Sequence, residues 1–328
     1  MSSFRIRAAI PADLPSLVTL FNVASPDHPT SLELQQHRER HRRPDLHFRR
    51  VVAVQDGPWG QEDGGILGVA TSAAQEWSGD VGRLVVAVTV HPERRGQGIA
   101  RALYDDLIGG LPGGTRHLMS VVREDRTDAL TFAARRGFQE VAREQDVALD
   151  LKDLRNDGRD EAFRRAAAGG YVLGTFAQHA ARVGADRAWE DLYALDLDAS
   201  RDVPLAPGDS LNHPPLARYR ETQEGRPDFD PDLVFVAERD GTLAALSELH
   251  PSPTPDRMGT GFTGVGREHR GHRLAWALKY LALEEAARRG VARVTTTNAS
   301  DNLPMRRINE GLGFRPLPAH LTLHATLP

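Results

Sequence analysis

The chain repeats one order of elements in its two halves, and this duplication limits the folds open to it. In the first half, an Arg-Gly pair at 95–96 opens an apolar-periodic helix and is followed by Gly-Phe at 137–138. In the second half, Arg-Gly at 270–271 and Gly-Phe at 313–314 recur at nearly the same spacing. Recurrence of strand, loop, helix, strand, helix and Gly-Phe in one order indicates an internal duplication.

Each half alternates strand and helix signals. In the first half we expect strands at 4–10, 50–55, 66–73, 84–90, 117–122 and 146–151, with helices at 12–21, 98–108 and 128–135. In the second half we expect strands at 171–178, 233–239, 242–249, 259–265, 292–297 and 321–327, with helices at 186–195, 274–289 and 303–311.

A chain of 328 residues is long enough for two hydrophobic cores. The polar segment 152–169 reads as a linker with a short helix. We therefore expect an N-terminal domain at 1–151 and a C-terminal domain at 170–328.

Composition excludes several function classes. The chain has no cysteine, so disulfides, thiolate metal sites and a cysteine nucleophile are ruled out. A net charge of −4 gives no general attraction to nucleic acid, and the basic segment 35–50 reads as a solvated helix face that could attract an anionic ligand. The histidines lack metal-ligand spacing, so no metal is expected. No signal peptide or membrane span is apparent, which makes the cytoplasm the expected compartment.

The loop before each long helix suits an anion. A buried strand that turns through glycine into a helix leaves several backbone N–H groups directed at one place, with the positive end of the helix dipole behind them. Gly96 and Gly98 allow the main chain to approach a ligand closely, and Arg94 and Arg95 add positive charge. A phosphate or pyrophosphate is the expected ligand, although neither the GxxxxGK[ST] nor the GxGxxG pattern is present.

The sequence RGQGIA at 95–100, with VHP before it and RRGF after it, resembles the acetyl-CoA motif of the GNAT superfamily of N-acetyltransferases. The second half matches through Arg270, Ala275 and the segment that runs from Asn302 to Phe314. The resemblance implies an α/β (α+β) chain of two tandem GNAT domains, each with a mixed, mostly antiparallel central sheet and flanking helices. It also implies acetyl-CoA as co-substrate, held through Val88, Thr89, Val90, Arg95, Gly96, Gln97, Gly98, Ile99 and Ala100 in the first half, and Val265, Arg270, Gly271, His272, Arg273, Leu274, Ala275 and Asn302 in the second.

Each half departs from the family pattern at a different position. The first half keeps the glycine loop but has Arg126 where the second half has Asn302. The second half has Arg273 where the first has Gly98. Arg273 could block a pyrophosphate or contact one of its phosphates, and the sequence does not choose between these. The complete glycine loop favours the N-terminal domain for acetyl-CoA binding, whereas tandem relatives tend to use the C-terminal domain for chemistry.

The catalytic residues are less clear than the loops. A tyrosine that protonates the departing thiolate in many relatives is replaced by Ala133 and Asn309, and Asn309 can donate a hydrogen bond but no proton. Glu76, Glu124 and Glu248 lie near strand ends and are candidate bases, each of which could equally be a surface charge. The leading hypothesis is an acyl-CoA-dependent N-acyltransferase for a small-molecule amine, as monomer or homodimer. The alternative is a non-catalytic acyl-CoA-binding or scaffold protein with one or both domains degenerate.

Overall fold

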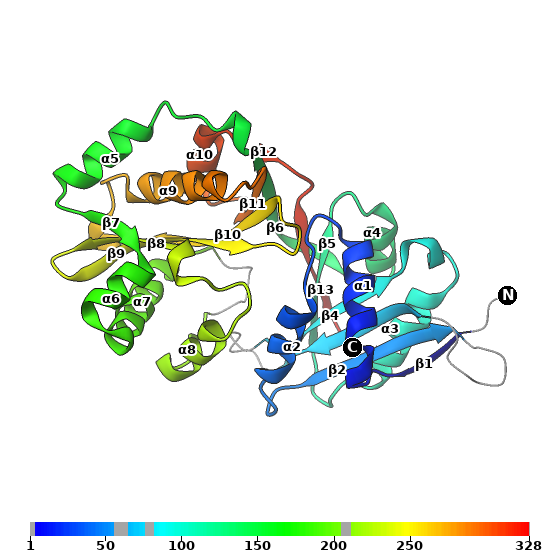
Figure 1. Cartoon of the computed structure of the whole chain (residues 1–328). Helices are drawn as coiled ribbons and strands as arrows, with labels where there is room; N and C mark the ends of the chain where they lie inside the picture. The colour runs from blue at the N-terminus through cyan, green and yellow to red at the C-terminus, as the bar shows by residue number, and fades with distance from the viewer. Residues whose placement is uncertain (1–3, 56–64, 76–81, 205–210, 328) are drawn as a thin grey trace. The chain divides into compact units, whose positions relative to one another are not determined.

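The computed structural model describes residues 4–55, 65–75, 82–204 and 211–327 (Figure 1). They belong to two compact units, which are described separately. The first unit comprises Met1–Ala142, Pro207–Asn212 and Leu321–Pro328, and the second comprises Arg143–Ala206 and His213–His320.

The first unit is built on a mixed sheet. In sheet order its strands are β1 (Phe4–Ala8), β2 (Phe48–Gln55), β3 (Ile66–Ala73), β4 (Arg83–Val90), β5 (His117–Arg123) and β13 (His320–Thr326). The pairs from β1 to β4 are antiparallel, and β4 with β5 is parallel. Its helices are α1 (Leu14–Ala24), α2 (Leu32–Arg40), α3 (Ile99–Gly109) and α4 (Thr127–Ala134). The apolar faces of α3 and the sheet form one core, which includes Leu103, Leu107 and Leu118.

The second unit repeats this arrangement. In sheet order its strands are β7 (Val172–Thr175), β8 (Val234–Arg239), β9 (Thr242–Pro251), β10 (Arg257–Val265), β11 (Arg293–Ala299) and β6 (Gln139–Asp150), with the short β12 (Arg315–Pro316) also on β6. Only β10 with β11 is parallel among these pairs. The helices are α5 (Arg159–Ala168), α6 (Phe176–Val183), α7 (Ala185–Ser200), α8 (Leu216–Glu224), α9 (Leu274–Arg288) and α10 (Leu303–Leu312). The predicted mixed, mostly antiparallel sheets with flanking helices are confirmed.

The last strand of each half belongs to the other unit, which differs from the domain limits expected at 1–151 and 170–328. From Glu144 to Asp150, β6 pairs with β11 of the second unit, and its Leu149 is part of the second unit's core. From Leu321 onward, β13 belongs to the first unit, where Leu321 and Leu323 join the core around α3. Neither sheet is therefore complete within one half of the sequence.

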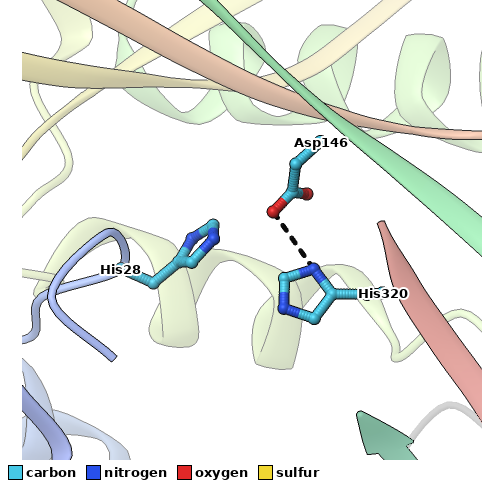
Figure 2. A group of neighbouring side chains, drawn as sticks. All are labelled: His28, Asp146 and His320. Atoms are coloured by element: carbon cyan, nitrogen blue, oxygen red, sulfur yellow. Dashed lines mark ion pairs between the residues drawn. The ribbon is translucent and has the colours of Figure 1, made fainter. Parts of the chain in front are cut away.

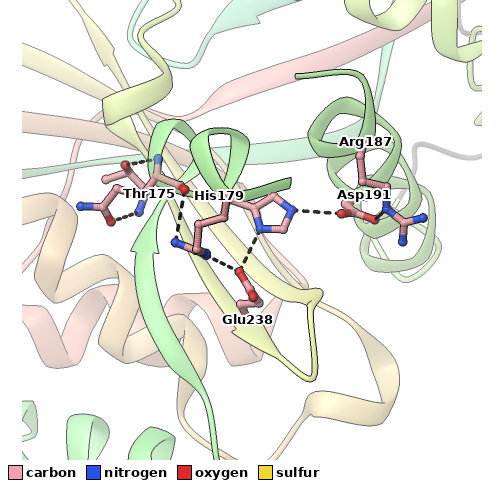
Figure 3. A network of polar contacts seen from close by, with 7 residues as sticks. Thr175, His179, Arg187, Asp191 and Glu238 are labelled. Atoms are coloured by element: carbon pink, nitrogen blue, oxygen red, sulfur yellow. Dashed lines mark hydrogen bonds and ion pairs between the residues drawn. The ribbon is translucent and has the colours of Figure 1, made fainter. Parts of the chain in front are cut away.

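The strand expected at 171–178 is too long. β7 ends at Thr175, and α6 begins at Phe176. Thr175 and Gln178 form a capping box, since the Gln178 N–H donates to Thr175 Oγ1 at 3.3 Å and the Thr175 N–H donates to Gln178 Oε1 at 3.1 Å (Figure 3). This reciprocal pair satisfies two backbone donors at the helix start and fixes the boundary.

A buried histidine ties α6 to its neighbours. His179 has none of its surface exposed, and its Nδ1 lies 2.8 Å from Glu238 Oε2 on β8 (Figure 3). Its Nε2 lies 3.0 Å from Asp191 Oδ2 on α7. Arg182 pairs with Glu238, and Arg187 pairs with Asp191 at 2.9 Å. One ring therefore holds a helix, its successor and a strand in fixed relation.

In the part of the chain that the structure describes, none of the helices combines the length and apolar character that a membrane span requires.

Candidate active site

In each unit, the two parallel strands separate towards their carboxyl ends. β4 pairs with β5 from Arg83 to Val85, although β4 continues to Val90. β10 pairs with β11 from Arg257 to Gly259, although β10 continues to Val265. The separated ends leave each sheet open beside the loop that leads into α3 or α9.

The loop of the first unit presents uncapped backbone amides. After the 3₁₀ turn Pro92–Arg94, Gly96 and Gly98 have φ of 76° and 82°, in the left-handed region that favours glycine. Gly98 is the N-cap of α3 and supplies no side-chain hydrogen bond. Within the described ranges, no group accepts a hydrogen bond from the N–H groups of residues 96–100. The loop therefore has the free donors that an anion needs.

The loop of the second unit has the same backbone conformation without the second glycine. It follows the 3₁₀ turn Arg267–His269, and Gly271 has φ of 86°. Arg273, the N-cap of α9, has φ of 59° and ψ of 24°. A non-glycine residue in this region costs about 1–2 kcal/mol. The described part of the chain again provides no acceptor for the N–H groups of residues 271–275. Arg273 thus keeps the loop geometry in spite of its backbone strain.

Positive charge lies beside the first loop. Burial lowers the pKa of the half-buried Arg95 guanidinium, and the positive charge of Arg126 lowers it further. Arg126 is the N-cap of α4 and donates from Nη1 to the Ala24 carbonyl at 3.2 Å. Among the described residues, the Arg95 side chain has no hydrogen bond or ion pair. Two neighbouring cations of this kind favour an anionic ligand.

The second loop contains three basic side chains, those of Arg270, His272 and Arg273, and one of the two arginines has no ion-pair partner among the described residues. Arg270 Nη2 lies 2.7 Å from Asp202 Oδ2, so its charge is compensated. The His272 ring packs against Tyr171, with 5.2 Å between ring centroids. The Arg273 guanidinium lies 5.9 Å from the Trp276 ring centroid, and in the described chain it forms no ion pair. Arg273 alone of the three retains an uncompensated positive charge.

The two asparagines of α10 have different surroundings. Asn302 is the N-cap, and its Oδ1 accepts a hydrogen bond from the Met305 N–H at 3.2 Å. Asn309 is 2% exposed, and neither its Nδ2 nor its Oδ1 has a hydrogen-bond partner in the structure. A buried amide without partners is costly, and a ligand that completes its hydrogen bonds would remove that cost. The corresponding position of the first unit is the buried Ala133.

Glu248 lies against an irregularity in β10. The register of β10 against β9 shifts between Thr260 and Thr263, which leaves Gly261 and Phe262 in a bulge. Glu248 Oε2 accepts a hydrogen bond from the Phe262 N–H at 3.1 Å. The same oxygen lies 3.4 Å from His250 Nε2. A Cβ at Gly261 would lie 2.5 Å from Glu248 Oε2, so a larger residue there would displace the carboxylate.

The first unit has no matching arrangement in its described residues. The register of β3 against β4 runs without a shift from Gly68 opposite Val90 to Ala73 opposite Val85. Glu124, a candidate base, lies half-buried in the turn between β5 and α4. Glu76, the remaining candidate, lies outside the described residues.

The other candidates for acetyl-CoA contact differ in exposure. Ile99, Leu274 and Ala275 are buried, and Ile99 and Leu274 pack into the cores of their units. Val88, Thr89, Ala100 and Val265 are half-buried, Val90 is buried and Gln97 is exposed. Side chains packed in the core can offer only their backbone groups to a ligand.

Two polar residues near Glu248 were not predicted. Asp196 lies on α7 beyond the helix end expected at residue 195, and Tyr219 lies on α8, which the sequence analysis did not identify. Burial raises the pKa of Asp196 to about 6, with a contribution from the negative charge of Glu248. The spacing Leu192–Leu195–Ala199 on one buried face of α7 is the signal that could have extended the helix to include Asp196.

The buried Asp146 of the second unit is engaged in structural contacts. Its Oδ2 lies 3.1 Å from His320 Nδ1 (Figure 2). Its Oδ1 accepts a hydrogen bond from Thr297 Oγ1 at 2.5 Å. A carboxylate held on both oxygens is a poor candidate for a base that must accept a substrate proton.

Comparison with known proteins agrees with the duplicated geometry. The family model described as "Acetyltransferase (GNAT) family" matches residues 16–138 and 189–314. The chain is similar to a mycothiol acetyltransferase of Frankia casuarinae, at 28% identity over 260 residues, 74% of this chain and 68% of that protein. A mycothiol acetyltransferase of Acidothermus cellulolyticus is 26% identical over 246 residues, 70% of this chain and 67% of that protein.

Two solved structures share the fold along nearly the whole chain. A tandem GNAT protein from the clavulanic acid biosynthesis pathway has a TM-score of 0.72 and 22% identity, covering 99% of this chain and 98% of that one. A GCN5-related N-acetyltransferase from Sphaerobacter thermophilus has a TM-score of 0.63 and 19% identity, covering 98% and 95%. Two matched regions, one in each half of the duplication, lead to one conclusion: the chain belongs to the GNAT family of N-acetyltransferases and carries two GNAT regions in tandem.

Proposed function

We propose that the protein transfers the acetyl group of acetyl-CoA directly to an amine of a small molecule, and that this chemistry takes place in the second unit. The observation that carries the proposal is Glu248, whose carboxylate lies against the β10 bulge. The bulge begins where β10 separates from β11. The first unit has a loop of the same kind but no such carboxylate among its described residues.

The second loop fits the phosphates of acetyl-CoA. The N–H groups of residues 271–275 are free among the described residues, and the positive end of the α9 dipole lies behind them. Arg273 supplies an uncompensated guanidinium at the same helix start. We therefore propose that Arg273 contacts a phosphate and does not block the site, because Arg forms strong charge-assisted hydrogen bonds with phosphate oxygens.

The reaction needs one base and one leaving group. Glu248 accepts a proton from the acceptor's ammonium, either directly or through a water molecule. The neutral amine nitrogen then attacks the thioester carbonyl carbon, so that a C–N bond forms and the C–S bond breaks. As the amide forms, its nitrogen loses a second proton to solvent, and CoA leaves as a thiolate that takes up a proton from solvent. The Asn309 side-chain N–H donates a hydrogen bond to the sulfur and stabilises the thiolate. It does not protonate the sulfur, because an amide is not an acid.

The first unit is proposed to bind acetyl-CoA without transferring its acetyl group. Its loop has free amides and the neighbouring cations Arg95 and Arg126. However, Ala133 takes the position of Asn309, and β4 follows β3 without a bulge. For this unit, the non-catalytic acyl-CoA-binding role is the better supported one.

A matched pair of loop variants tests the proposal in the full chain. Gly96 and Gly271 both have positive φ, and a Cβ at either position would meet nothing within 4 Å. A tryptophan at either position adds a bulky side chain to the loop, at a similar backbone cost in the two units because both φ values are positive. We expect calorimetric titration with acetyl-CoA to give two bound molecules for the wild type and one for Gly96→Trp or Gly271→Trp. Release of CoA in the presence of a panel of amines should be lost with Gly271→Trp. Loss of turnover with Gly96→Trp alone would assign the chemistry to the first unit.

A further inference from the structure

Three side chains from three elements of the second unit converge beside the β10 bulge. They are Asp196 of α7, Tyr219 of α8 and Glu248 of β9. Phe262, whose N–H binds Glu248, packs into the same apolar cluster as Tyr219 and as the residues Leu195 and Ala199, which flank Asp196 on α7. Burial and the charges of Asp196 and Glu248 all raise the pKa of Tyr219, so both carboxylates are close to its phenol group. We call these three residues the acidic pocket.

Two members of the acidic pocket lack partners. Tyr219 is 9% exposed, and no described residue shares a hydrogen bond with its hydroxyl group. The Asp196 carboxylate likewise has neither a hydrogen bond nor an ion pair in the described chain. Neither the Tyr219 hydroxyl nor an Asp196 oxygen is among the fully buried atoms without a partner, so a ligand can reach both groups from solvent. Because Asp196 is largely buried, a cation beside it would stabilise its charged form. The two groups therefore point to a ligand that donates hydrogen bonds and carries positive charge.

The protein does not itself neutralise the two carboxylates. Arg226 is the cation whose charge acts on Tyr219 and lowers its pKa. Its Nε lies 2.6 Å from Asp228 Oδ1, and its Nη2 lies 3.0 Å from His250 Nδ1. Asp228 thus offsets the charge of Arg226, and among the described residues no cation lowers the pKa of Asp196.

Aromatic rings pack against Tyr219 of the acidic pocket. The Tyr193 and Tyr219 rings are 5.2 Å apart, and Trp189 stacks on Phe229 at 5.5 Å within the same cluster. Aromatic faces attract organic cations and accommodate an apolar carbon chain between charged groups. The surroundings fit an alkylammonium compound better than a compound that carries its own carboxylate, which the two acidic residues would repel.

We propose that the acidic pocket binds an acceptor with two ammonium groups, one held by Asp196 and Tyr219 and the other delivered to Glu248 for acetylation. The inference rests on the proposed function, since Glu248 is the base of that reaction. A single ammonium would leave one buried negative charge uncompensated, whereas a dication neutralises both carboxylates. The substrate class is therefore a diamine or an amino compound with a second amine, such as an aminosugar with two amino groups.

Calorimetry on the full chain without acetyl-CoA tests this inference independently of turnover. The probes are α,ω-diaminoalkanes of three to six carbons and the monoaminoalkanes of equal length, at pH 7.5. At least one diamine should bind ten or more times more tightly than its monoamine. Asp196→Asn should reduce that preference to about twofold or less, and Tyr219→Phe should weaken it. Glu190→Gln, an exposed substitution on the same helix, should leave it intact.

A second readout separates a direct contact from a structural role. A dication that binds Asp196 stabilises its ionised form, so at pH 6 binding should release protons, seen as different heats in two buffers of different ionisation enthalpy. Glu248 acts on Asp196 directly, and the other titratable groups around Tyr219 and Glu248 that could contribute are Tyr193, Arg226 and His250. The Asp196→Asn variant should lose the proton release. Equal binding of diamines and monoamines, no binding of either, or a preference that survives Asp196→Asn would overturn the inference. Diamine binding without acetyl transfer would instead overturn the proposed function alone.

Discussion

The Glu248 carboxylate accepts a hydrogen bond from the Phe262 backbone N–H at 3.1 Å, where β10 shifts register against β9. The bulge leaves this N–H without a regular strand partner, and the side chain of Glu248 takes that place. In return, the N–H fixes one carboxylate oxygen. The other oxygen remains available for a substrate proton, which is the property that a general base requires.

Arg273 should strain its own backbone while it strengthens acetyl-CoA binding. Arg273→Gly removes a left-handed non-glycine residue, so the free energy of unfolding should rise by about 1 kcal/mol. The same change removes a guanidinium from the loop and should weaken acetyl-CoA binding about tenfold. Urea unfolding and calorimetry in the Gly96→Trp background measure the two effects.

Arg270→Gln is the control for this change, because Arg270 is already paired with Asp202. It should weaken acetyl-CoA binding less than Arg273→Gly does. Tighter binding by Arg273→Gly would mean that the guanidinium obstructs the phosphate site.

The exchange of β13 predicts that a change near the C-terminus weakens the first unit. Leu323 is 5% exposed in the core around α3, and Leu323→Ala should cost about 2–5 kcal/mol. Amide hydrogen exchange should increase in β5, which neighbours β13. Thr326→Ala, at an exposed position of the same strand, should have little effect. Faster exchange in β11 with β5 unchanged would contradict the assignment.

His179 should contribute more to stability than the charges at the edge of its network. His179→Leu leaves Asp191 and Glu238 without the ring between them, and removing one partner of a buried charged network costs about 3–5 kcal/mol. Arg187→Ala removes a largely exposed partner of Asp191 and should cost less than about 1 kcal/mol. Urea unfolding of the two variants gives the comparison, and similar losses would show that the buried ring is not essential.

Because of Lys279, the free energy of unfolding should rise as the pH becomes alkaline. It is 2% exposed, and burial lowers the pKa of its ammonium group to about 8. Because the unfolded value is about 10.4, the folded state binds fewer protons between these limits, and its stability increases as pH rises through them. The gain is on the order of 3 kcal/mol. Lys279→Met should be more stable than the wild type at pH 7, and the difference should shrink towards pH 10. A constant difference would exclude this origin.

The sequence predicts most of the elements and both loops, because the hydrophobic periods and the glycine positions are local signals. The end of β7 was missed although Thr175 and Gln178 form a capping box that is visible in the sequence. The exchange of β6 and β13 could not be predicted, because both strands contain buried residues and either could complete either sheet.

In the candidate site, the residue with a local sequence signal was predicted and the residues that depend on tertiary packing were not. Glu248 was found because it lies on a strand with a clear pattern. Asp196 and Tyr219 belong to helices in the segment between β7 and β8, and only tertiary packing brings them to Glu248. The conformation of Arg273 also depends on the fold around it, since a sequence pattern that favours glycine gives no means of predicting an arginine with positive φ.

The most direct test of the account is the steady-state rate of CoA release by Glu248→Gln with acetyl-CoA and an amine that the wild type accepts. Removal of a general base should lower kcat by about 10²–10⁴-fold, while KM for acetyl-CoA stays within about twofold. The dependence of the residual rate on pH should lose the limb that reflects ionisation of the base. A kcat within about threefold of the wild type, with the pH profile unchanged, would contradict a catalytic centre at Glu248 in the second unit.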